Sequence, residues 1–343
     1  MLRRCLVLVS MFFCLAACSD QNAGSTKTTA PANNTVLAQT TVSTIRVTLQ
    51  DAVAAYEKRD YGTAYKLFQD LAERGDIEAQ YRLGLMCYDR GIGTIGWSTD
   101  PEAWSDPFSE SAKWWRKAAE QGDSKARYRL GRHLIEGSPK DYAEAVKLLH
   151  QAAEQGNVDA QEYLGGMYSV GLCIPKDFAE AAKWYRKAAE QGQADAQVFV
   201  GMMYDDDDHG TFAGAVNDGI TVKKDYVEAV KWYRKAAEQG EAAGQNALGD
   251  MYYDGHGVTK DYVEAANWYR KAAEQEMVAA QYNLGRMYNL GRGVPQNYSE
   301  AVKWYRKVAE SPLGWTRAKK ILGIMYDYGP WRATGLCGGA YVV

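Results

Sequence analysis

DYVEAVKWYRKAAEQG, residues 225–240, is the stretch that decides the fold. Its apolar side chains stand at i, i+3, i+4, i+7 and i+8, the spacing of one helix face: Ala229, Trp232, Tyr233, Ala236 and Ala237. Asp225 precedes the first turn, where its carboxylate can accept hydrogen bonds from free backbone N–H groups, and Glu228 can complete a capping box. Gly240 supplies the left-handed conformation that ends a helix. The stretch therefore predicts an amphipathic helix with a defined start and end.

The same stretch recurs along the chain. AEQG or a close relative ends at Gly75, Gly122, Gly156, Gly192 and Gly240, with Glu276 and Pro312 in the equivalent places. The spacing is about 36 residues, and two of the units are longer by about 12 residues. Repeats of this length are typical of helix pairs that stack into a solenoid, because a single pair cannot bury its apolar face alone.

A second motif, Leu-Gly-x-x-Tyr, precedes these stretches, as at Leu248, Gly249 and Tyr252. A glycine inside a helix costs about 1 kcal/mol relative to alanine, so its recurrence calls for a compensation. We expect the glycine to let the neighbouring Trp-bearing helix approach closely. Each unit is therefore predicted to hold two short helices. On an apolar face at this spacing, the Trp and Tyr side chains are expected to form the core rather than a ligand cage.

Together the motifs read A-x-x-LG-x-x-Y-x-x-G-x-G-V and then D-Y-x-E-A-x-x-WYRKAAEQG, with a near-consensus loop at residues 291–295. This pattern closely resembles the Sel1-like repeat, a relative of the tetratricopeptide repeat. The resemblance implies an all-α fold, a right-handed α-solenoid of stacked antiparallel helix pairs. The expected organisation is a tetratricopeptide-like helix pair over residues 47–75, six Sel1-like repeats over 76–311 with insertions near 89–107 and 205–224, a terminal helix over 312–328 and an irregular tail over 329–343.

The N-terminus is expected to lie outside the fold. Arg3 and Arg4 precede an apolar run over residues 6–15, which is typical of a signal peptide and too short to span a bilayer as a helix. Leu15-Ala16-Ala17-Cys18 resembles the lipobox of bacterial lipoproteins. This implies a signal peptide over residues 1–17 and lipidation of Cys18, although an ordinary secretory signal with a chance cysteine is the alternative. Residues 18–46 are rich in Ser and Thr and lack aromatic residues, so we expect a disordered tether.

Composition and residue spacing give no indication of catalysis. The net charge of −3, with Lys and Glu interspersed, provides no footprint for nucleic acid. Cys87, Cys173 and Cys337 form neither a disulfide framework nor a C-x-x-C pair. None of the four histidines stands at metal-ligand spacing from a cysteine: His133, His150, His209 and His256. We therefore expect no catalytic residue, no metal and no cofactor.

One acidic run opens the second insertion, at Asp205, Asp206, Asp207 and Asp208. Clustered carboxylates can bind calcium weakly, because hard cations prefer oxygen ligands. Adjacent carboxylates point in different directions, however, and the alternate spacing of an EF-hand is missing. A solvated loop is the favoured interpretation.

The leading hypothesis for function is a non-catalytic, protein-binding adaptor that faces the periplasm and is anchored to the outer membrane by lipid on Cys18. Stacked helix pairs offer an extended surface that usually binds polypeptide. Two alternatives come from resemblance. Some Sel1-like lipoproteins neutralise phospholipase effectors of the type VI secretion system, and a cysteine-rich Sel1-like branch is credited with penicillin binding and hydrolysis. Cys87 and Cys173 do not show the paired cysteines of that branch, which argues against the enzyme.

Partner contacts are expected where the repeat is interrupted, since insertions in solenoids map to one face, often the binding face. The candidates in the insertions are Trp97, Trp104, the four aspartates from Asp205 to Asp208, and Phe212. Tryptophans outside a packed consensus are enriched at interface hot spots. The alternatives are that both insertions are tolerated decoration and that partners contact concave positions of the solenoid, at Tyr81, Arg82, Tyr128 and Arg129.

Overall fold

The structure is a computed structural model that describes residues 48–91, 107–137, 142–205, 216–217, 220–221, 224–311 and 319–322. All of them belong to the unit Val47–Val343. Within these ranges the chain is helical apart from one very short hairpin. No helix in the described ranges is both long enough and apolar enough to cross a membrane.

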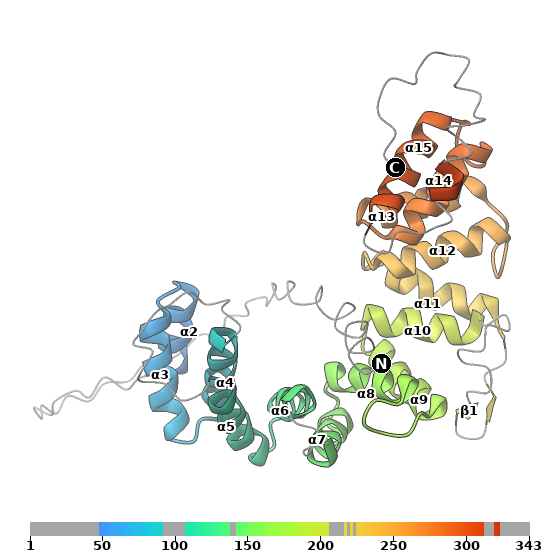
Figure 1. Cartoon of the computed structure of the whole chain (residues 1–343). Helices are drawn as coiled ribbons and strands as arrows, with labels where there is room; N and C mark the ends of the chain where they lie inside the picture. Colours follow the sequence, from blue (N-terminus) through green and yellow to red (C-terminus); the bar gives the residue numbers. More distant parts are fainter. Residues whose placement is uncertain are drawn as a thin grey trace, which may run out of the picture. The chain divides into compact units, whose positions relative to one another are not determined.

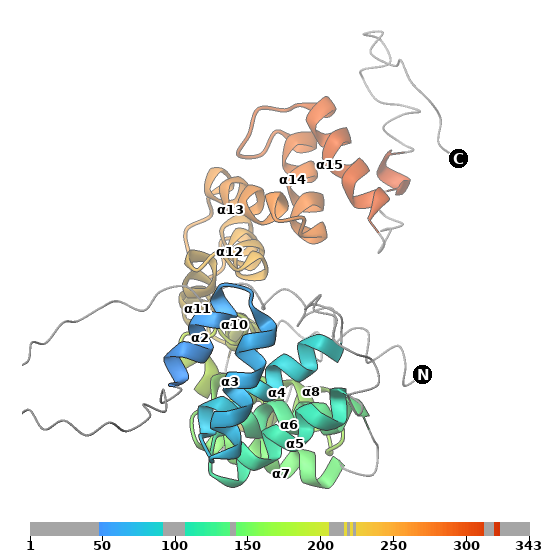
Figure 2. The same cartoon turned by 90° about the vertical axis from the view of Figure 1, so that its left-hand side faces the viewer.

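The helices follow one another as pairs along the chain. The first pair is α2 (Leu49–Glu57) and α3 (Tyr61–Glu73). The next six pairs are α4 (Ile77–Gly91) with α5 (Pro107–Glu120), α6 (Ser124–Gly137) with α7 (Tyr142–Glu154), α8 (Val158–Val170) with α9 (Phe178–Glu190), α10 (Ala194–Asp205) with α11 (Tyr226–Glu238), α12 (Ala242–Asp254) with α13 (Tyr262–Glu274), and α14 (Val278–Leu290) with α15 (Tyr298–Glu310). Each helix packs against its neighbours in the chain, as Figures 1 and 2 show. The predicted all-α solenoid of stacked helix pairs is confirmed.

The second helix begins at its predicted cap in α9, α11, α13 and α15. The Asp225 carboxylate accepts hydrogen bonds from the N–H groups of Val227 (3.0 Å) and Glu228 (3.1 Å). The reciprocal half of the predicted capping box does not form, because the N–H of Asp225 donates to the carbonyl of Tyr204 (2.9 Å) and thus joins α11 to α10. Glu228 instead accepts from the ammonium of Lys231 (2.7 Å). The same backbone bond joins Asp177 to Tyr168, Asp261 to Tyr252 and Asn297 to Tyr288.

The recurring glycine of the first helix lets the second helix approach closely, as predicted. In five units out of six the glycine contacts an aromatic ring, which belongs to a tyrosine in four of them, whereas Gly131 contacts Leu149. A Cβ built on Gly201 would lie 2.5 Å from the ring of Tyr233, and one built on Gly249 would lie 2.7 Å from Tyr269. Tyr233 is buried, whereas Trp232 is half-buried with the ammonium of Lys235 4.0 Å from its ring centroid. Successive helix residues point about 100° apart. Only one of the adjacent pair can therefore face the glycine, and only in the unit of Gly84 is it a tryptophan, Trp115.

A buried glutamine in the first helix connects consecutive units. Gln161 donates to the carbonyl of Ala153 in the preceding unit (2.9 Å) and accepts from Gln191 at the end of its own unit (2.7 Å). Gln80, Gln197 and Gln245 make the same two bonds, and Gln281 makes the carbonyl bond. We call this set the glutamine ladder. In α6 the position holds Arg127, whose Nε donates to the carbonyl of Ala119 (3.1 Å).

The second insertion contains the described strands, β1 (Val216–Asn217) and β2 (Ile220–Thr221). They pair in antiparallel register, with Val216 opposite Thr221 and Asn217 opposite Ile220, and β1 contacts α9. The sequence predicted only a loop in this region. The hairpin is too short to change the fold class.

Candidate binding face on the first helices

Side chains from consecutive first helices meet one another along α4, α6, α8, α10, α12 and α14. We call these side chains the first-helix face, and its members are Tyr81, Arg82, Tyr128, Arg129, Arg132, Glu162, Tyr163, Asp195, Asn246, Asp250, Asn283 and Arg286. The face includes all four positions that the sequence analysis offered as concave contacts. Their helices place them together because the residues three or four apart on a helix share one side.

The four predicted positions differ in how much of each side chain solvent reaches. Tyr81 is half-buried, with the ammonium of Lys125 6.0 Å from its ring centroid. Arg82 forms an ion pair with Glu78 and is 40% exposed. The guanidinium of Arg129 lies 5.9 Å from the ring of Tyr128. Tyr128 itself is only 6% exposed, so its ring supports the cations above it rather than offering a surface of its own.

Arg132 joins α6 to α8 across this face. Its guanidinium lies 5.8 Å from the ring centroid of Tyr128 and 5.6 Å from that of Tyr163, and the two rings meet edge to face at 6.1 Å. One guanidinium nitrogen donates to the Tyr128 hydroxyl (3.3 Å) and another to Glu136 (3.1 Å). We call Tyr128, Arg132 and Tyr163 the arginine–tyrosine cluster. Neither Arg132 nor Tyr163 was predicted from the sequence, although Arg132 follows the Leu-Gly motif at a position that varies between units.

On the next first helices, α8 and α10, the face carries carboxylate side chains. Burial, and secondarily the charge of Asp195, raises the pKa of Glu162 to about 7, and Gln193 donates a hydrogen bond to it. Burial also raises the pKa of Asp195 to about 6, with a smaller contribution from Glu241. The face is thus cationic and aromatic on α6, and acidic from α8 to α12.

A network of polar side chains connects α12 and α14. Asp250 accepts hydrogen bonds from the hydroxyl of Tyr269 (2.6 Å) and the amides of Asn246 (3.1 Å) and Asn283 (3.3 Å). Burial raises the pKa of Asp250 to about 6 despite the bond from Tyr269. Arg286 extends the network by donating to the hydroxyl of Tyr253 (3.5 Å). This end of the face offers amide, carboxylate and guanidinium groups together.

The positions predicted in the insertions lie almost entirely outside the described residues: Trp97, Trp104, Asp206, Asp207, Asp208 and Phe212. Asp205 is described and is the last residue of α10. Its carboxylate accepts a hydrogen bond from the hydroxyl of Tyr233 (3.2 Å), so it connects the two helices of its unit.

The remaining reactive side chains of the described part are dispersed. No group of three or more His, Cys, Asp or Glu side chains there is arranged to hold a metal ion. His133 packs among Tyr88, Phe108 and Trp115, and His256 stacks on Tyr226 at 4.2 Å. Cys87 is buried and Cys173 half-buried, and neither forms a disulfide.

Comparison with known proteins identifies the family of the repeat. A family model described as Sel1 repeat matches seven segments: residues 55–76, 77–123, 124–157, 158–193, 194–241, 242–277 and 278–312. The first segment contains α3, so the repeat also reaches into the helix pair that the sequence analysis set apart. No curated protein matches the chain.

Solved structures show the same repeat. The crystal structure of a Sel1 repeat protein from Oxalobacter formigenes is 29% identical, covers 77% of this chain and 97% of its own, and has a TM-score of 0.60. A protective antigen of uropathogenic Escherichia coli with an SLR fold is 30% identical, covers 86% of this chain and 72% of its own, and has a TM-score of 0.46. An immunity protein from Pseudomonas aeruginosa is 20% identical, covers 67% and 82%, and has a TM-score of 0.39, too distant to bear on function. The chain belongs to the Sel1 repeat family.

Proposed function

We propose that this chain is a non-catalytic scaffold that binds a protein partner through its first-helix face. A Sel1 repeat solenoid is a scaffold suited to protein binding. One observation carries the more specific proposal. The residue directly after each Leu-Gly or Val-Gly varies between units, and only arginine occurs twice: Leu85, Arg132, Gly166, Met202, Asp250 and Arg286.

Packing residues recur while this position varies, and the difference separates two roles. The glycine, the buried glutamine and the tyrosine opposite the glycine recur because every unit must bury the same interface. Varying side chains on the same helices are free of that constraint and can be selected for a partner. The sequence of charges along the face, cationic on α6 and acidic from α8 to α12, gives such a partner a direction and a register.

We also propose a cellular localisation for the scaffold. Lipidation of Cys18 would hold the scaffold at the periplasmic side of the outer membrane, as the lipobox-like Leu15-Ala16-Ala17-Cys18 indicates. We expect Cys18→Ala to accumulate in the unprocessed form and to leave the membrane fraction, as followed by fractionation and intact-protein mass spectrometry. Wild-type-like maturation of this variant would contradict the lipoprotein assignment.

The binding face is tested by affinity capture of the lipidated protein from envelope extracts. Arg129→Glu reverses a half-buried charge on the first-helix face, and Lys235→Glu is its matched control on an exposed second-helix position. We expect the first variant to lose the captured partner and the control to retain it, with unchanged circular dichroism for both. Equal capture by the two variants would exclude this face.

The same capture decides between the face and the insertions. A chain with both insertions trimmed to the length of the residue 253–260 loop should keep its partner if the first-helix face binds. Recovery of a phospholipase effector would identify the scaffold as an immunity protein. Turnover of nitrocefin by the pure protein would contradict the non-catalytic assignment.

A further inference from the structure

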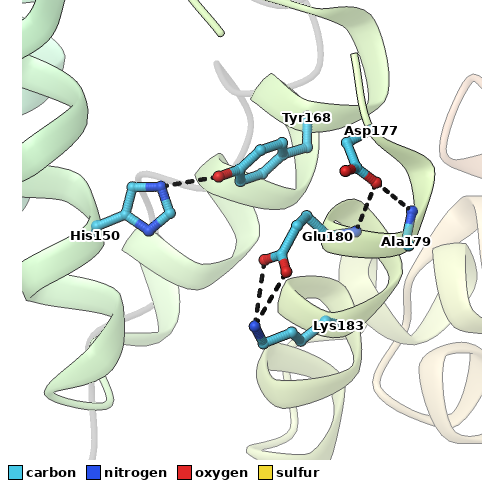
Figure 3. Close-up of polar contacts among 6 residues, drawn as sticks. All are labelled: His150, Tyr168, Asp177, Ala179, Glu180 and Lys183. Carbon is cyan, nitrogen blue, oxygen red and sulfur yellow. Dashed lines mark hydrogen bonds and ion pairs between the residues drawn. The ribbon is translucent and has the colours of Figure 1, made fainter. Parts of the chain in front are cut away.

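One polar contact recurs between the second helix of a unit and the first helix of the next. A guanidinium donates to a tyrosine hydroxyl 18 residues on, in the pairs Arg186 and Tyr204 (3.0 Å), Arg234 and Tyr252 (2.9 Å), and Arg270 and Tyr288 (3.3 Å). In α7 the same place holds His150, whose Nε2 lies 3.1 Å from the hydroxyl of Tyr168, as Figure 3 shows. In each of these contacts one basic side chain binds one hydroxyl.

The hydroxyl of Tyr253, near the end of α12, departs from this pattern because two guanidinium groups of the next unit donate to it. One belongs to Arg286 on α14 (3.5 Å), and the other to Arg292 in the loop that follows α14. Their central carbons lie 5.4 Å and 5.6 Å from the ring centroid of Tyr253. The ring of Tyr262, 5.1 Å from that of Tyr253, is also 5.4 Å from Arg292. We call these four residues the double-arginine site.

The two positive charges of this site have no carboxylate partner among the described residues. Arg82 and Arg132 on the same face form ion pairs with Glu78 and Glu136, whereas Arg286 and Arg292 form none in the described part of the chain. A guanidinium has five N–H donors, and each of these two gives one to Tyr253, so most remain available to a ligand. Two neighbouring cations also repel each other, and a bound anion relieves that repulsion.

The residues that meet at the Tyr253 hydroxyl are all departures from the repeat. Other units fold with different side chains in these places, so packing does not require them. The place of Tyr253 holds Ser169, Asp205 and Asn289 elsewhere, that of Arg292 holds Leu172 and His256, and that of Arg286 holds Leu85, Arg132, Gly166, Met202 and Asp250.

Polar groups beside the site indicate which anion fits. The amide nitrogen of Asn283, on the same helix as Arg286, donates to Asn246 (3.2 Å) and Asp250 (3.3 Å). Its amide oxygen accepts no hydrogen bond from the described residues and can receive the N–H of a peptide group. Asp250 and Asp254 lie on the helix of Tyr253 and repel a doubly charged phosphate more than a singly charged carboxylate. The surroundings therefore favour a carboxylate on a polypeptide.

We propose that the double-arginine site binds an Asp or Glu side chain of a polypeptide segment, through charge-assisted hydrogen bonds from Arg286 and Arg292. The planar fork of a guanidinium matches the two oxygens of a carboxylate. The site follows from the contacts of α12 and α14 alone. That the segment belongs to the captured partner rests on the proposed function.

Fluorescence anisotropy with a labelled hexaglutamate peptide and the purified full-length protein, at low ionic strength, tests the site. We expect Arg286→Gln and Arg292→Gln each to weaken binding roughly tenfold, because each removes a charged hydrogen bond. Tyr253→Phe keeps both charges but removes the hydroxyl that gathers them, so it should also weaken binding. The control is Lys271→Gln with Lys307→Gln, which removes two exposed charges from α13 and α15 and should leave binding unchanged.

Three outcomes would overturn the site: equal losses in the double arginine and double lysine variants, wild-type binding by Tyr253→Phe, and no binding of hexaglutamate by the wild type. Binding of phosphatidylglycerol vesicles instead of the peptide, lost in the arginine variants, would assign the site to a lipid headgroup and contradict the proposal. Circular dichroism confirms that each variant is folded.

Capture from envelope extracts is the separate arm. The variant with both arginines replaced by glutamine should lose the partner that the wild type captures. If it keeps that partner while it no longer binds hexaglutamate, the assignment of the segment to the partner fails and the proposed function stands. If the wild type binds hexaglutamate but captures no protein, the scaffold function fails and the site stands.

Discussion

Gly165 and Gly166 are adjacent in α8 yet face different surroundings. A Cβ on Gly165 would lie 2.8 Å from the ring of Tyr185, whereas one on Gly166 would lie 3.5 Å from its hydroxyl, an ordinary contact. Either alanine gains about 1 kcal/mol of helix propensity. The added methyl group at Gly165 overpacks the contact with Tyr185 at a cost of roughly 1–3 kcal/mol. We therefore expect the free energy of unfolding of Gly165→Ala, measured in urea, to be lower than that of Gly166→Ala by about this amount. Equal stability of the two variants would show that the ring of Tyr185 can move aside.

The adjacent aromatic residues of α11 give a second test at this scale. Tyr233 is 2% exposed and faces Gly201, so Tyr233→Ala should cost roughly 3–5 kcal/mol. Trp232 is half-buried under Lys235, and its truncation should cost roughly 1–2 kcal/mol. Thermal and urea unfolding of both variants measure the order. A larger loss from Trp232→Ala would contradict the burial described here.

Which of these two residues faces the glycine was beyond the sequence alone. Helical spacing places both Trp232 and Tyr233 on one broad apolar face, and their types suggest the larger residue as the filler. The distinction depends on the rotation of α11 against α10, which the bond from Asp225 to the carbonyl of Tyr204 helps to fix. The N–H of Asp225 makes this bond, whereas the predicted capping box would have paired that N–H with the side chain of Glu228.

At the contacts between helices, two glutamine substitutions are expected to lower stability by different amounts, because only one of the two residues belongs to the glutamine ladder. Gln161→Leu removes two buried hydrogen bonds, the one to the carbonyl of Ala153 and the one from the amide of Gln191, although that carbonyl still accepts from the N–H of Gly156 (3.1 Å). We expect a loss of roughly 0.5–1.5 kcal/mol for each bond. Gln155 is exposed, so Gln155→Leu should change stability by less than about 0.5 kcal/mol. Urea unfolding compares the two. A neutral Gln161→Leu would mean that the ladder contributes nothing beyond its shape.

The existence and the bounds of the helices were the features best predicted from the sequence. An aspartate cap and an apolar face predict the bounds of α11 and α13, and Gly240, which closes α11, has the expected positive φ of 93°. Glu276 adopts the same conformation, with a φ of 65°, although it is not glycine. The hairpin was missed, even though Asp218-Gly219 between β1 and β2 is a dipeptide that two-residue hairpin turns prefer.

The buried carboxyl of Glu162 is expected to make the free energy of unfolding of the whole molecule depend on pH. Its folded-state pKa of about 7 lies above the ordinary 4.5, so its contribution is fully present below 4.5 and is lost as pH rises through 7. The loss is roughly 3 kcal/mol at most. Unfolding free energies from pH 5 to pH 8 should fall for the wild type and fall less for Glu162→Gln. Asp195 and Asp250, each with a pKa raised to about 6, retain part of the slope.

If Glu162→Gln shows the full wild-type slope, the carboxyl of Glu162 is solvated and the acidic part of the first-helix face is open.

The first-helix face could be predicted only in part from the sequence. Tyr81, Arg82, Tyr128 and Arg129 were named from their places in the repeat, but burial of Tyr128 and the position of Arg132 between two tyrosines depend on how α6 meets α8. The carboxylates of α8 to α12 had no signature of their own. Glu162 stands where other units carry tyrosine, valine or asparagine, and only the packed structure shows that it is enclosed.

The glutamine ladder also bears on how such a chain grows in evolution. Each glutamine finds its carbonyl in the unit before it, and each except Gln281 finds its donor in its own unit, at fixed places. A gene segment of about 36 codons, copied in tandem, would therefore encode a new unit that arrives with all its polar contacts satisfied and needs no compensating mutation. The segment for residues 124–157 is the exception. Its Arg127 lacks the glutamine oxygen and its His150 lacks the guanidinium, so recombination through it would transmit an altered junction to each copy.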